Sequence, residues 1–432
     1  MKPAASFQLL GAYRRARWLD AIRDRAVLEK YQQLWLRRLT KHVMLNSPYY
    51  QRLRSKPFVN WPVIDKATWM ARFDDVNTVG AQLDEVSEVA LQAERTRDFS
   101  PMWREFTVGL STGTSGSRGL FLVSSEERAR WAGTLLGKLL RSGLLARERI
   151  ALVLRAGSGL YESIAALRLS FRFFDQAQPW EATVGALSAF QPTILVAPPR
   201  VLRLLVESGC ELRPRRVISV AEVLDDLDRA RIEAGFDVPV EQIYQATEGL
   251  LGISCEVGTV HLNEPYLLVE PEWQDAEHTR FVPVVTDLWR RTQPVIRYRL
   301  NDILRIAPVP CPCGRATRAL AAIDGRLDDV LWLDGRRSAV AVFPDLLTRA
   351  VVGAASKLDD FEIVELARGR WRIGLRPLPP PQTQQRLIAD IRAIVSRLDG
   401  TPPDIEIATL VAKRLSGKQR RVRGVGGLAC AS

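Results

Sequence analysis

Residues 110–120 read LSTGTSGSRGL, a stretch of small, hydroxylated and glycine residues that contains a single arginine. The segments on either side, 106–108 and 120–123, carry the apolar and β-branched residues that are typical of strands. Stretches rich in Gly, Ser and Thr are usually linkers, but a loop between two strands can turn successive backbone N–H groups toward an anion. The stretch has no Walker A spacing. Two interpretations stay open at this point, a connector and a phosphate-binding loop.

Length and composition indicate a globular protein of more than one domain. A chain of 432 residues predicts two or three domains, and 47% hydrophobic with 25% charged residues is ordinary for a soluble protein. We find no apolar run near the roughly 18–20 residues that span a bilayer, and no signal-peptide pattern at the N-terminus. Five cysteines, an odd number, do not suggest a disulfide framework. We therefore expect a cytoplasmic protein without stable membrane insertion.

The charge balance is strongly basic, because 61 Lys and Arg residues outnumber 49 Asp and Glu residues to give a net charge of +12. Such an excess often indicates nucleic-acid binding. Here the basic residues are spread through many segments, so an arginine-rich composition alone is an alternative. Polyphosphate ligands or an acidic partner protein would suit the same surface.

Strands and helices alternate through the middle of the chain. Helical spacing of apolar residues predicts a helical segment over 1–56, and Asp65 is expected to cap a helix that starts at Lys66. From residue 149 onward we expect strands at 150–154, 193–197, 216–220 and 240–244, with helices over 160–170, 201–208 and 224–234. This alternation predicts an α/β core.

The pattern changes after Asp328. We expect paired strands at 330–333 and 339–342, a hairpin of 361–366 with 371–375, a helix over 383–398 and a strand at 405–407. These elements amount to an α+β domain of roughly 100 residues, a common domain size. The expected organisation is a large N-terminal α/β domain over 1–328 and a small, mobile C-terminal α+β domain over 329–432.

Five further segments have the composition of short functional motifs and follow one another in a defined order along the chain. They are SVAEVL at 219–224, YQATEG at 244–249, PVIRYRLND at 294–302, GRLDD at 325–329 and SGKQRR at 416–421. Together with the 110–120 stretch, their order and spacing resemble the adenylate-forming superfamily. The chain is most similar to the branch of phenylacetate–CoA ligase and the deazaflavin-nucleotidylating synthetases. HVMLNSPYY at 42–50 and WPVIDK at 61–66 extend this resemblance over nearly the whole chain.

The resemblance implies a nucleotide site assembled from these motifs. The phosphate loop over 111–119 would close on the β,γ-phosphates of ATP, and Arg118 stands where the family often has lysine. Loop residues implied in this contact are Ser111, Thr112, Gly113, Thr114, Ser115, Gly116 and Arg118. Ala221 and Glu222 would join the nucleotide site from the end of the 216–220 strand.

The resemblance also implies a role for each remaining motif residue. Tyr244 would stack on adenine, Thr247 would contact the α-phosphate, and Glu248 would hold Mg²⁺, a hard cation that prefers oxygen ligands. Asp302 would accept both ribose hydroxyls and Arg326 would add a ribose or phosphate contact. Lys418 would bridge the substrate carboxylate and the α-phosphate. Each has a non-functional alternative: a core aromatic, a solvated loop acid, a turn residue or a basic tail.

Four residues suggest a metal site. Cys255, His261, Cys311 and Cys313 offer the number of soft or borderline ligands that a tetrahedral structural zinc takes. CPCGR at 311–315 resembles an element of the same branch, in which some members bind zinc. The alternative is a set of buried free thiols.

The function that the resemblance implies is activation of a carboxylic acid by MgATP as an acyl adenylate, followed by transfer to a thiol. The branch favours aromatic acids, so we expect an aryl acid, with 155–161 in its pocket. The thiol would belong to coenzyme A or to the phosphopantetheine of an acidic carrier protein, and a homodimer is compatible with this reading. Alternatives are a transferase that leaves AMP on a deazaflavin phenol, a basic zinc-containing nucleic-acid-binding protein and an inactive homologue.

Overall fold

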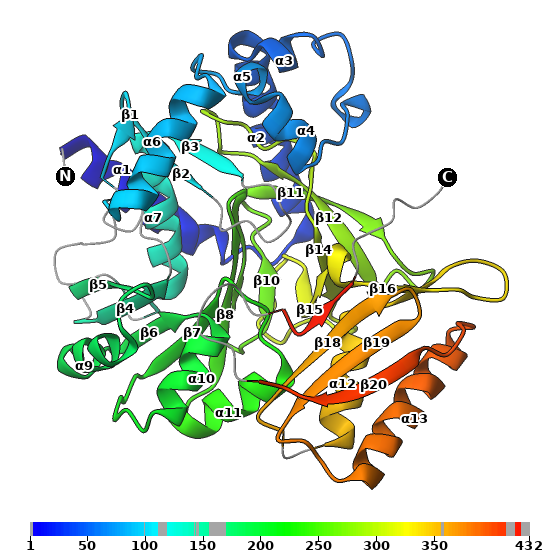
Figure 1. Ribbon diagram of the computed structural model, residues 1–432. Helices are drawn as coiled ribbons and strands as arrows, with labels where there is room; N and C mark the ends of the chain where they lie inside the picture. Colours follow the sequence, from blue (N-terminus) through cyan, green and yellow to red (C-terminus); the bar gives the residue numbers. More distant parts are fainter. Residues whose placement is uncertain are drawn as a thin grey trace. The chain divides into compact units, whose positions relative to one another are not determined.

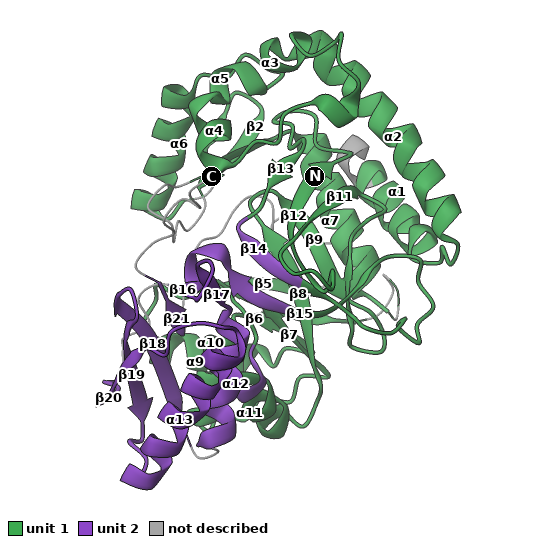
Figure 2. Ribbon diagram, turned by 90° about the vertical axis from the view of Figure 1, so that its right-hand side faces the viewer, with its two compact units in different colours: residues 1–224, 228–300, 305–322 green, residues 225–227, 301–304, 323–432 purple. Residues whose placement is uncertain are grey.

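A computed structural model describes residues 3–98, 100–110, 119–141, 143, 147–154, 170–355, 358–411 and 420–424, with side chains from residue 7 onward. The chain forms two compact units, coloured separately in Figure 2. The first comprises residues 1–224, 228–300 and 305–322, and the second comprises 225–227, 301–304 and 323–432. The fold is mixed α/β, as predicted.

Helices dominate the N-terminal part of the chain, and the first two, with 17 and 22 residues, are long. The described helices before residue 240 are α1 (Pro3–Leu19), α2 (Arg25–Asn46), α3 (Pro48–Gln51), η1 (Phe58–Asn60), α4 (Lys66–Ala71), α5 (Phe73–Val76), α6 (Leu83–Thr96), α7 (Ser125–Leu139), α9 (Trp180–Phe190), α10 (Pro199–Glu207) and α11 (Asp226–Phe236). Ser47 separates α2 from α3, where Pro48 begins a new helix. Asp65 caps α4 by accepting a 2.8 Å hydrogen bond from the Thr68 backbone N–H. The predicted cap is therefore confirmed.

A twelve-stranded sheet dominates the fold (Figure 1). Its strands are β4 (Arg149–Leu154), β5 (Ser170–Asp175), β6 (Ile194–Ala197), β7 (Arg216–Val220), β8 (Val240–Ala246), β9 (Gly249–Ser254), β10 (Val260–Leu262), β11 (Leu267–Trp273), β12 (Arg280–Asp287), β13 (Tyr298–Arg299), β14 (Asp302–Ile306) and β15 (Ala319–Arg326). Their order is β11-β12-β14-β15-β10-β9-β8-β7-β6-β4-β5, with β13 paired to β12.

The predicted alternating core forms the parallel part of this sheet. The expected strands correspond to β4, β6, β7 and β8, which pair in parallel with one another in the order β4-β6-β7-β8. Two expected helices correspond to α10 and α11. The helix expected over 160–170 lies outside the described residues except for Ser170, which begins β5. Both faces of β6 and β7 are buried, and most of their residues are apolar, as is usual for parallel strands.

A small antiparallel sheet carries the glycine-rich stretch. It consists of β1 (Met102–Trp103), β2 (Phe106–Leu110) and β3 (Leu120–Val123) in that order. Leu110 pairs with Leu120, so residues 111–118 connect the two arms of a hairpin. The predicted flanking strands are confirmed, while the connection itself lies outside the described residues.

The second unit contains the predicted C-terminal α+β elements together with three that were not predicted, at 327–329, 344–354 and 422–423. They are η2 (Leu327–Asp329), β16 (Leu331–Leu333), β17 (Val340–Val342), α12 (Pro344–Ala354), β18 (Asp360–Ala367), β19 (Arg370–Arg376), α13 (Pro381–Arg397), β20 (Asp404–Thr409) and β21 (Val422–Arg423). Four strands form a sheet in the order β20-β19-β18-β21. Its core includes Trp371, Ile373, Leu387 and Ile391, all fully buried. A domain break at Asp328 and mobility of this part stay predictions.

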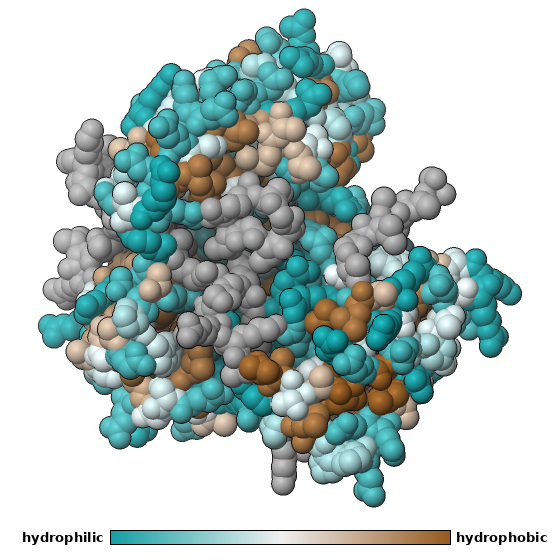
Figure 3. Space-filling view, viewed as in Figure 1, coloured by the Kyte–Doolittle hydropathy of each residue, from teal (hydrophilic) through white to brown (hydrophobic). Residues whose placement is uncertain are grey.

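The surface is largely hydrophilic. On the face shown in Figure 3, polar and charged side chains cover most of the described surface, and apolar side chains gather in separate patches. No helix in the described part of the chain combines the length and apolar character needed to cross a membrane.

Candidate nucleotide and metal sites

The ends of β7 and β8 carry two of the motifs. Val220 pairs in parallel with Ile243, so both strands end at the same edge of the sheet, the usual place of ligand sites in such sheets. Ala221 follows β7 with φ of 70°, a left-handed conformation that is rare for residues other than glycine. Tyr244 is only 8% exposed and belongs largely to the core. A β-bulge follows it, a feature that can redirect side chains next to functional sites.

Thr247 and Glu248 form the turn between β8 and β9, since Ala246 pairs with Gly249. Gly249 has φ of 153°, and a Cβ at this position would lie 3.3 Å from Oδ2 of Asp287. The turn is therefore tight and packs closely against the end of β12. Both Thr247 and Glu248 are half-buried, which leaves their side chains accessible to a ligand.

A buried arginine holds this turn. Arg290, 7% exposed, donates a 2.8 Å hydrogen bond from Nη1 to the carbonyl oxygen of Thr247. Burial lowers the pKa of Arg290, and the nearby carboxylates of Asp287, Glu127 and Glu248 oppose that shift. A guanidinium stays charged at this depth when such carboxylates surround it. The site thus has a buried positive charge that is hydrogen-bonded to the backbone of the Thr247–Glu248 turn.

Burial also perturbs two acidic groups around this arginine. It raises the pKa of Asp287 to about 6, against backbone hydrogen bonds from Trp289 and Arg290 and the charge of Arg290. Burial, together with the neighbouring Glu248 carboxylate, raises the pKa of Tyr298. The charge of Glu248 thus acts on Tyr298 and on Arg290, and shifted pKa values of this kind are common at functional sites.

Asp302 and Arg326 meet in the second unit. Asp302 begins β14 and Arg326 ends β15, and Arg326 Nε lies 3.7 Å from Asp302 Oδ1. Both side chains keep partial exposure, at 30% for Arg326 and 19% for Asp302. Asp302, which the resemblance assigns to the ribose, and Arg326, which it assigns to the ribose or a phosphate, are thus neighbours.

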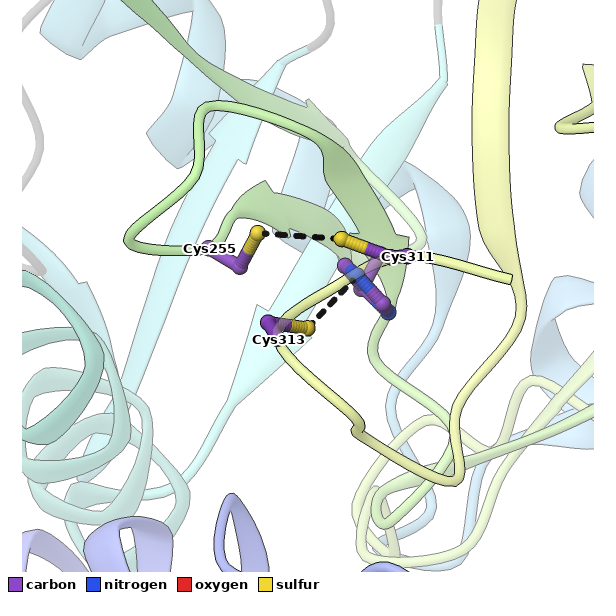
Figure 4. Close-up of side chains that lie close together, drawn as sticks. Cys255, Cys311 and Cys313 are labelled. Carbon is purple, nitrogen blue, oxygen red and sulfur yellow. Dashed lines mark hydrogen bonds between the residues drawn. The ribbon is translucent and has the colours of Figure 1, made fainter. Parts of the chain in front are cut away.

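The four predicted metal ligands converge (Figure 4). Their ligand atoms all lie within 4.8 Å of one another, with 3.7 Å between the sulfurs of Cys255 and Cys311. The sulfur of Cys313 lies 3.3 Å from His261 Nε2. Cys255 follows β9 and His261 lies in β10, whereas Cys311 and Cys313 come from the loop between β14 and β15.

The geometry of this Cys/His group suits zinc. Tetrahedral zinc with bonds of about 2.3 Å to sulfur places two thiolates about 3.8 Å apart, close to the observed separation. Burial opposes ionisation of both Cys311 and Cys313; hydrogen bonds from the Cys313 backbone and from His261 lower the pKa of Cys311 to about 6, whereas the neighbouring cysteines help to raise the pKa of Cys313. Thiolates are the form that binds zinc. With all four positions supplied by protein, a zinc ion here would be structural and would join two loops.

Some predicted site residues lie outside the described part of the chain. These are the phosphate-loop residues 111–118, the expected pocket segment 155–161 and Lys418. Conversely, sequence reasoning missed Asp287, Arg290 and Gln293. They lie in FVPVVTDLWRRTQPVI at 281–296, where polar residues interrupt an otherwise apolar segment, but this pattern does not indicate which residues they contact.

Comparisons with known proteins agree with this picture, although no family model matches the chain. Phenylacetate-coenzyme A ligase of Escherichia coli is 25% identical over 279 residues, which cover 58% of this chain and 61% of the relative. The same enzyme of Thermus thermophilus is 25% identical over 209 residues, 44% of this chain and 45% of the relative. The chain thus spans about half to three fifths of the length of these relatives.

Solved structures resemble this chain in fold over a larger part of its length than the sequence relatives do. A crystal structure of 2-hydroxyisobutyryl-CoA ligase in complex with 2-HIB-AMP has a TM-score of 0.67 at 18% identity, covering 94% of this chain and 90% of that one. An anthranilate CoA ligase in complex with anthranoyl-AMP has a TM-score of 0.52 at 14% identity, with coverages of 73% and 66%. The resemblance predicted from the motifs is confirmed: the chain is similar to phenylacetate–CoA ligases in sequence and to the adenylate-forming CoA ligases in fold.

Proposed function

We propose that this protein activates a carboxylic acid with MgATP as an acyl adenylate, releasing pyrophosphate, and then transfers the acyl group to a thiol with release of AMP. The observation that carries the proposal is the Thr247–Glu248 turn, which lies at the carboxyl edge of the sheet and is held by Arg290. A hydroxyl and a carboxylate on a rigid turn suit an α-phosphate and its Mg²⁺.

The remaining roles follow the motifs. Tyr244 would face adenine, Asp302 and Arg326 would bind the ribose, and residues 111–118 would enclose the β,γ-phosphates. Lys418 would neutralise charge where the carboxylate attacks the α-phosphorus. Positioning and charge stabilisation suffice for transfer at phosphorus.

We further propose an aryl acid as the substrate and coenzyme A as the acceptor. Similarity to proteins named phenylacetate-coenzyme A ligase supports both. The net charge of +12 suits the phosphates of coenzyme A, and it equally suits an acidic carrier protein. Zinc would bind Cys255, His261, Cys311 and Cys313 and stabilise the large unit without taking part in the reaction.

ATP–pyrophosphate exchange across a panel of aryl and aliphatic acids tests the proposal. We expect exchange with some aryl acids and, on adding coenzyme A, the matching thioester by mass spectrometry. Thioester formation only on a phosphopantetheinylated carrier protein would identify the other acceptor. AMP attached to a deazaflavin phenol, with no exchange for any acid, would replace this proposal with a nucleotidyl transfer.

A further inference from the structure

The glutamine side chain of Gln293 occupies the free edge of β3. This strand is the last in its three-stranded sheet, so one row of its backbone groups has no neighbouring strand among the described residues. Gln293 Oε1 accepts a 2.8 Å hydrogen bond from the Leu122 N–H, and Gln293 Nε2 donates one of 3.1 Å to the Leu120 carbonyl. The amide therefore binds β3 as the peptide group of an adjacent strand would. Gln293 is 1% exposed.

The same amide oxygen also binds Arg290. Arg290 Nη2 donates a 3.0 Å hydrogen bond to Gln293 Oε1, while Arg290 Nη1 donates to the Thr247 carbonyl at 2.8 Å. With two donors on its oxygen and a carbonyl on its nitrogen, the Gln293 amide has only one consistent orientation. A continuous set of hydrogen bonds thus runs from β3 through Gln293 and Arg290 to the Thr247–Glu248 turn, and all but the last are fully buried.

The backbone that carries these two side chains is fixed as well. Glu127, in the first turn of α7, accepts hydrogen bonds through Oε1 from the backbone N–H groups of Arg291 and Thr292, at 2.6 and 2.9 Å. Its other oxygen accepts from the Ser124 N–H at 2.8 Å. Since α7 directly follows β3, the strand, the helix start and the 290–293 segment form one hydrogen-bonded assembly.

This assembly joins two parts of the chain that the proposed reaction needs at one nucleotide. Leu120 begins β3, the strand that follows the proposed phosphate loop in the chain. Thr247 and Glu248 form the turn that is proposed to bind the α-phosphate and Mg²⁺. We infer that Gln293 and Arg290 are positioning residues, which fix the Thr247–Glu248 turn relative to β3, the strand that follows the proposed phosphate-loop motif, so that the turn can meet MgATP. The inference rests on the proposed function and assigns these two side chains no contact with substrate.

A positioning role predicts a particular kinetic signature. A displacement of about 1 Å between catalytic groups can cost about 10²-fold in rate. Gln293→Met keeps the length of the side chain but removes its donor and acceptors. We expect it to lower pyrophosphate exchange about 10²-fold and to raise the Mg²⁺ and ATP concentrations for half-maximal exchange. Arg290→Lys keeps the buried charge with a single compact donor group, so its effect should be in the same direction and smaller.

Gln32 provides a matched control. It is 3% exposed, and its Nε2 donates 2.9 Å hydrogen bonds to the carbonyls of Glu264 and Leu267. Gln32→Met therefore also removes a buried amide that joins two segments of the large unit. It should lower the melting temperature about as much as Gln293→Met, yet leave the Mg²⁺ and ATP dependence unchanged.

The experiment measures exchange against Mg²⁺ and ATP for the wild type and the three variants, with melting temperatures alongside. Shifted dependence in Gln293→Met and Arg290→Lys, and not in Gln32→Met, supports the inference. Wild-type dependence in folded Gln293→Met, or equal shifts in Gln32→Met, overturns it. If Gln293→Met does not fold, Arg290→Lys decides by the same criterion. A wild type without exchange for any acid overturns the proposed function, and this inference falls with it.

Discussion

His261 Nδ1 lies 3.0 Å from the backbone oxygen of Thr317, while its Nε2 faces the sulfur of Cys313. A carbonyl at Nδ1 places the proton there and leaves Nε2 as a lone-pair donor, the usual arrangement of a zinc-bound histidine. We therefore expect about one zinc per chain, measured by elemental analysis of the purified protein. Cys313→Ser should lose the metal and lower the melting temperature.

Cys210→Ser is the control for this prediction, because Cys210 contacts Ser188 and lies outside the Cys/His group. It should keep the metal content of the wild type. Stable, metal-free wild-type protein would remove zinc from this account.

Glu248→Gln should weaken the binding of Mg²⁺ and so raise the Mg²⁺ concentration that adenylation requires. A neutral amide oxygen holds a hard dication less well than a carboxylate does, so the Mg²⁺ concentration for half-maximal exchange should rise about tenfold or more, the effect of losing about 1.4 kcal/mol of binding. Glu272→Gln, which alters a carboxylate paired with Arg299, should behave like the wild type. An unchanged Mg²⁺ response in Glu248→Gln would show that the metal lies elsewhere.

Asp302→Ala should mainly raise the KM for ATP. Ribose contacts exist in both the ground state and the transition state, so their loss weakens binding more than turnover. The 3.7 Å separation from Arg326 Nε adds a second expectation: Arg326→Ala should shift the same parameter in the same direction. Steady-state exchange at varied ATP measures both. A fall in kcat at constant KM for both variants would contradict a ribose role.

The sequence predicted four of the parallel strands, β4, β6, β7 and β8, but not β5, and it predicted the C-terminal hairpin, because these signals are local. Strands such as 216–220 are short apolar runs bounded by polar residues, and Asp65 before Lys66 has the side chain that a helix start needs. The antiparallel strands from β9 to β15 were not identified. Their side chains face different neighbours along one strand, so no single period describes them.

The residues of the candidate sites also fall into those that the sequence could predict and those that it could not. Motif residues could be predicted because their spacing matches a family, and the four metal ligands because cysteine and histidine are rare here. Gln293 and Arg290 could not, since their roles depend on β3, which lies about 170 residues away in the chain. A buried glutamine bound to a strand edge leaves no periodic signal in the sequence.

Asp287 should make stability depend on pH. Burial raises its pKa in the folded protein to about 6, whereas an exposed aspartate titrates near 4. The folded state therefore binds more protons between about pH 4 and 6, and this group's contribution to stability falls as pH rises through that window. Asp287→Asn keeps an acceptor for the Trp289 and Arg290 N–H groups but cannot ionise.

The comparison to make is the difference in melting temperature between Asp287→Asn and the wild type. The melting temperature of Asp287→Asn should rise relative to that of the wild type from pH 4.5 to pH 7, because only the wild type carries a buried charge at the higher pH. Asp275→Asn, at an aspartate whose pKa is lowered, should show an almost constant difference over this range, because that carboxyl is ionised in both the folded and the unfolded state above about pH 4.5. A constant difference for Asp287→Asn across this range would mean that the carboxyl is ionised at both pH values.

Lys418 lies outside the described residues, but the strands before and after it do not support the interpretation of a basic tail. β20 pairs with β19, and β21 pairs in parallel with β18, so the segment between them is a connection within one sheet. Beyond it, Arg420 Nε donates to Asp329 at 2.7 Å, and Arg421 Nε donates to Asp360 at 3.1 Å. Gly417, just before the lysine, permits a tight turn.

An ammonium group on a long stem can bridge the substrate carboxylate and the α-phosphate as charge moves between them, and losing such a contact typically costs about 10²–10³-fold in rate. Lys418→Ala should therefore lose acyl-adenylate formation by that factor. It should still transfer the acyl group from synthetic adenylate to a thiol, because that step forms no new bond at phosphorus. Lys413→Ala, in the same connection, should retain both half-reactions. Equal loss of both steps in folded Lys418→Ala would contradict a role confined to adenylation, and loss of neither would assign the lysine no part in the reaction.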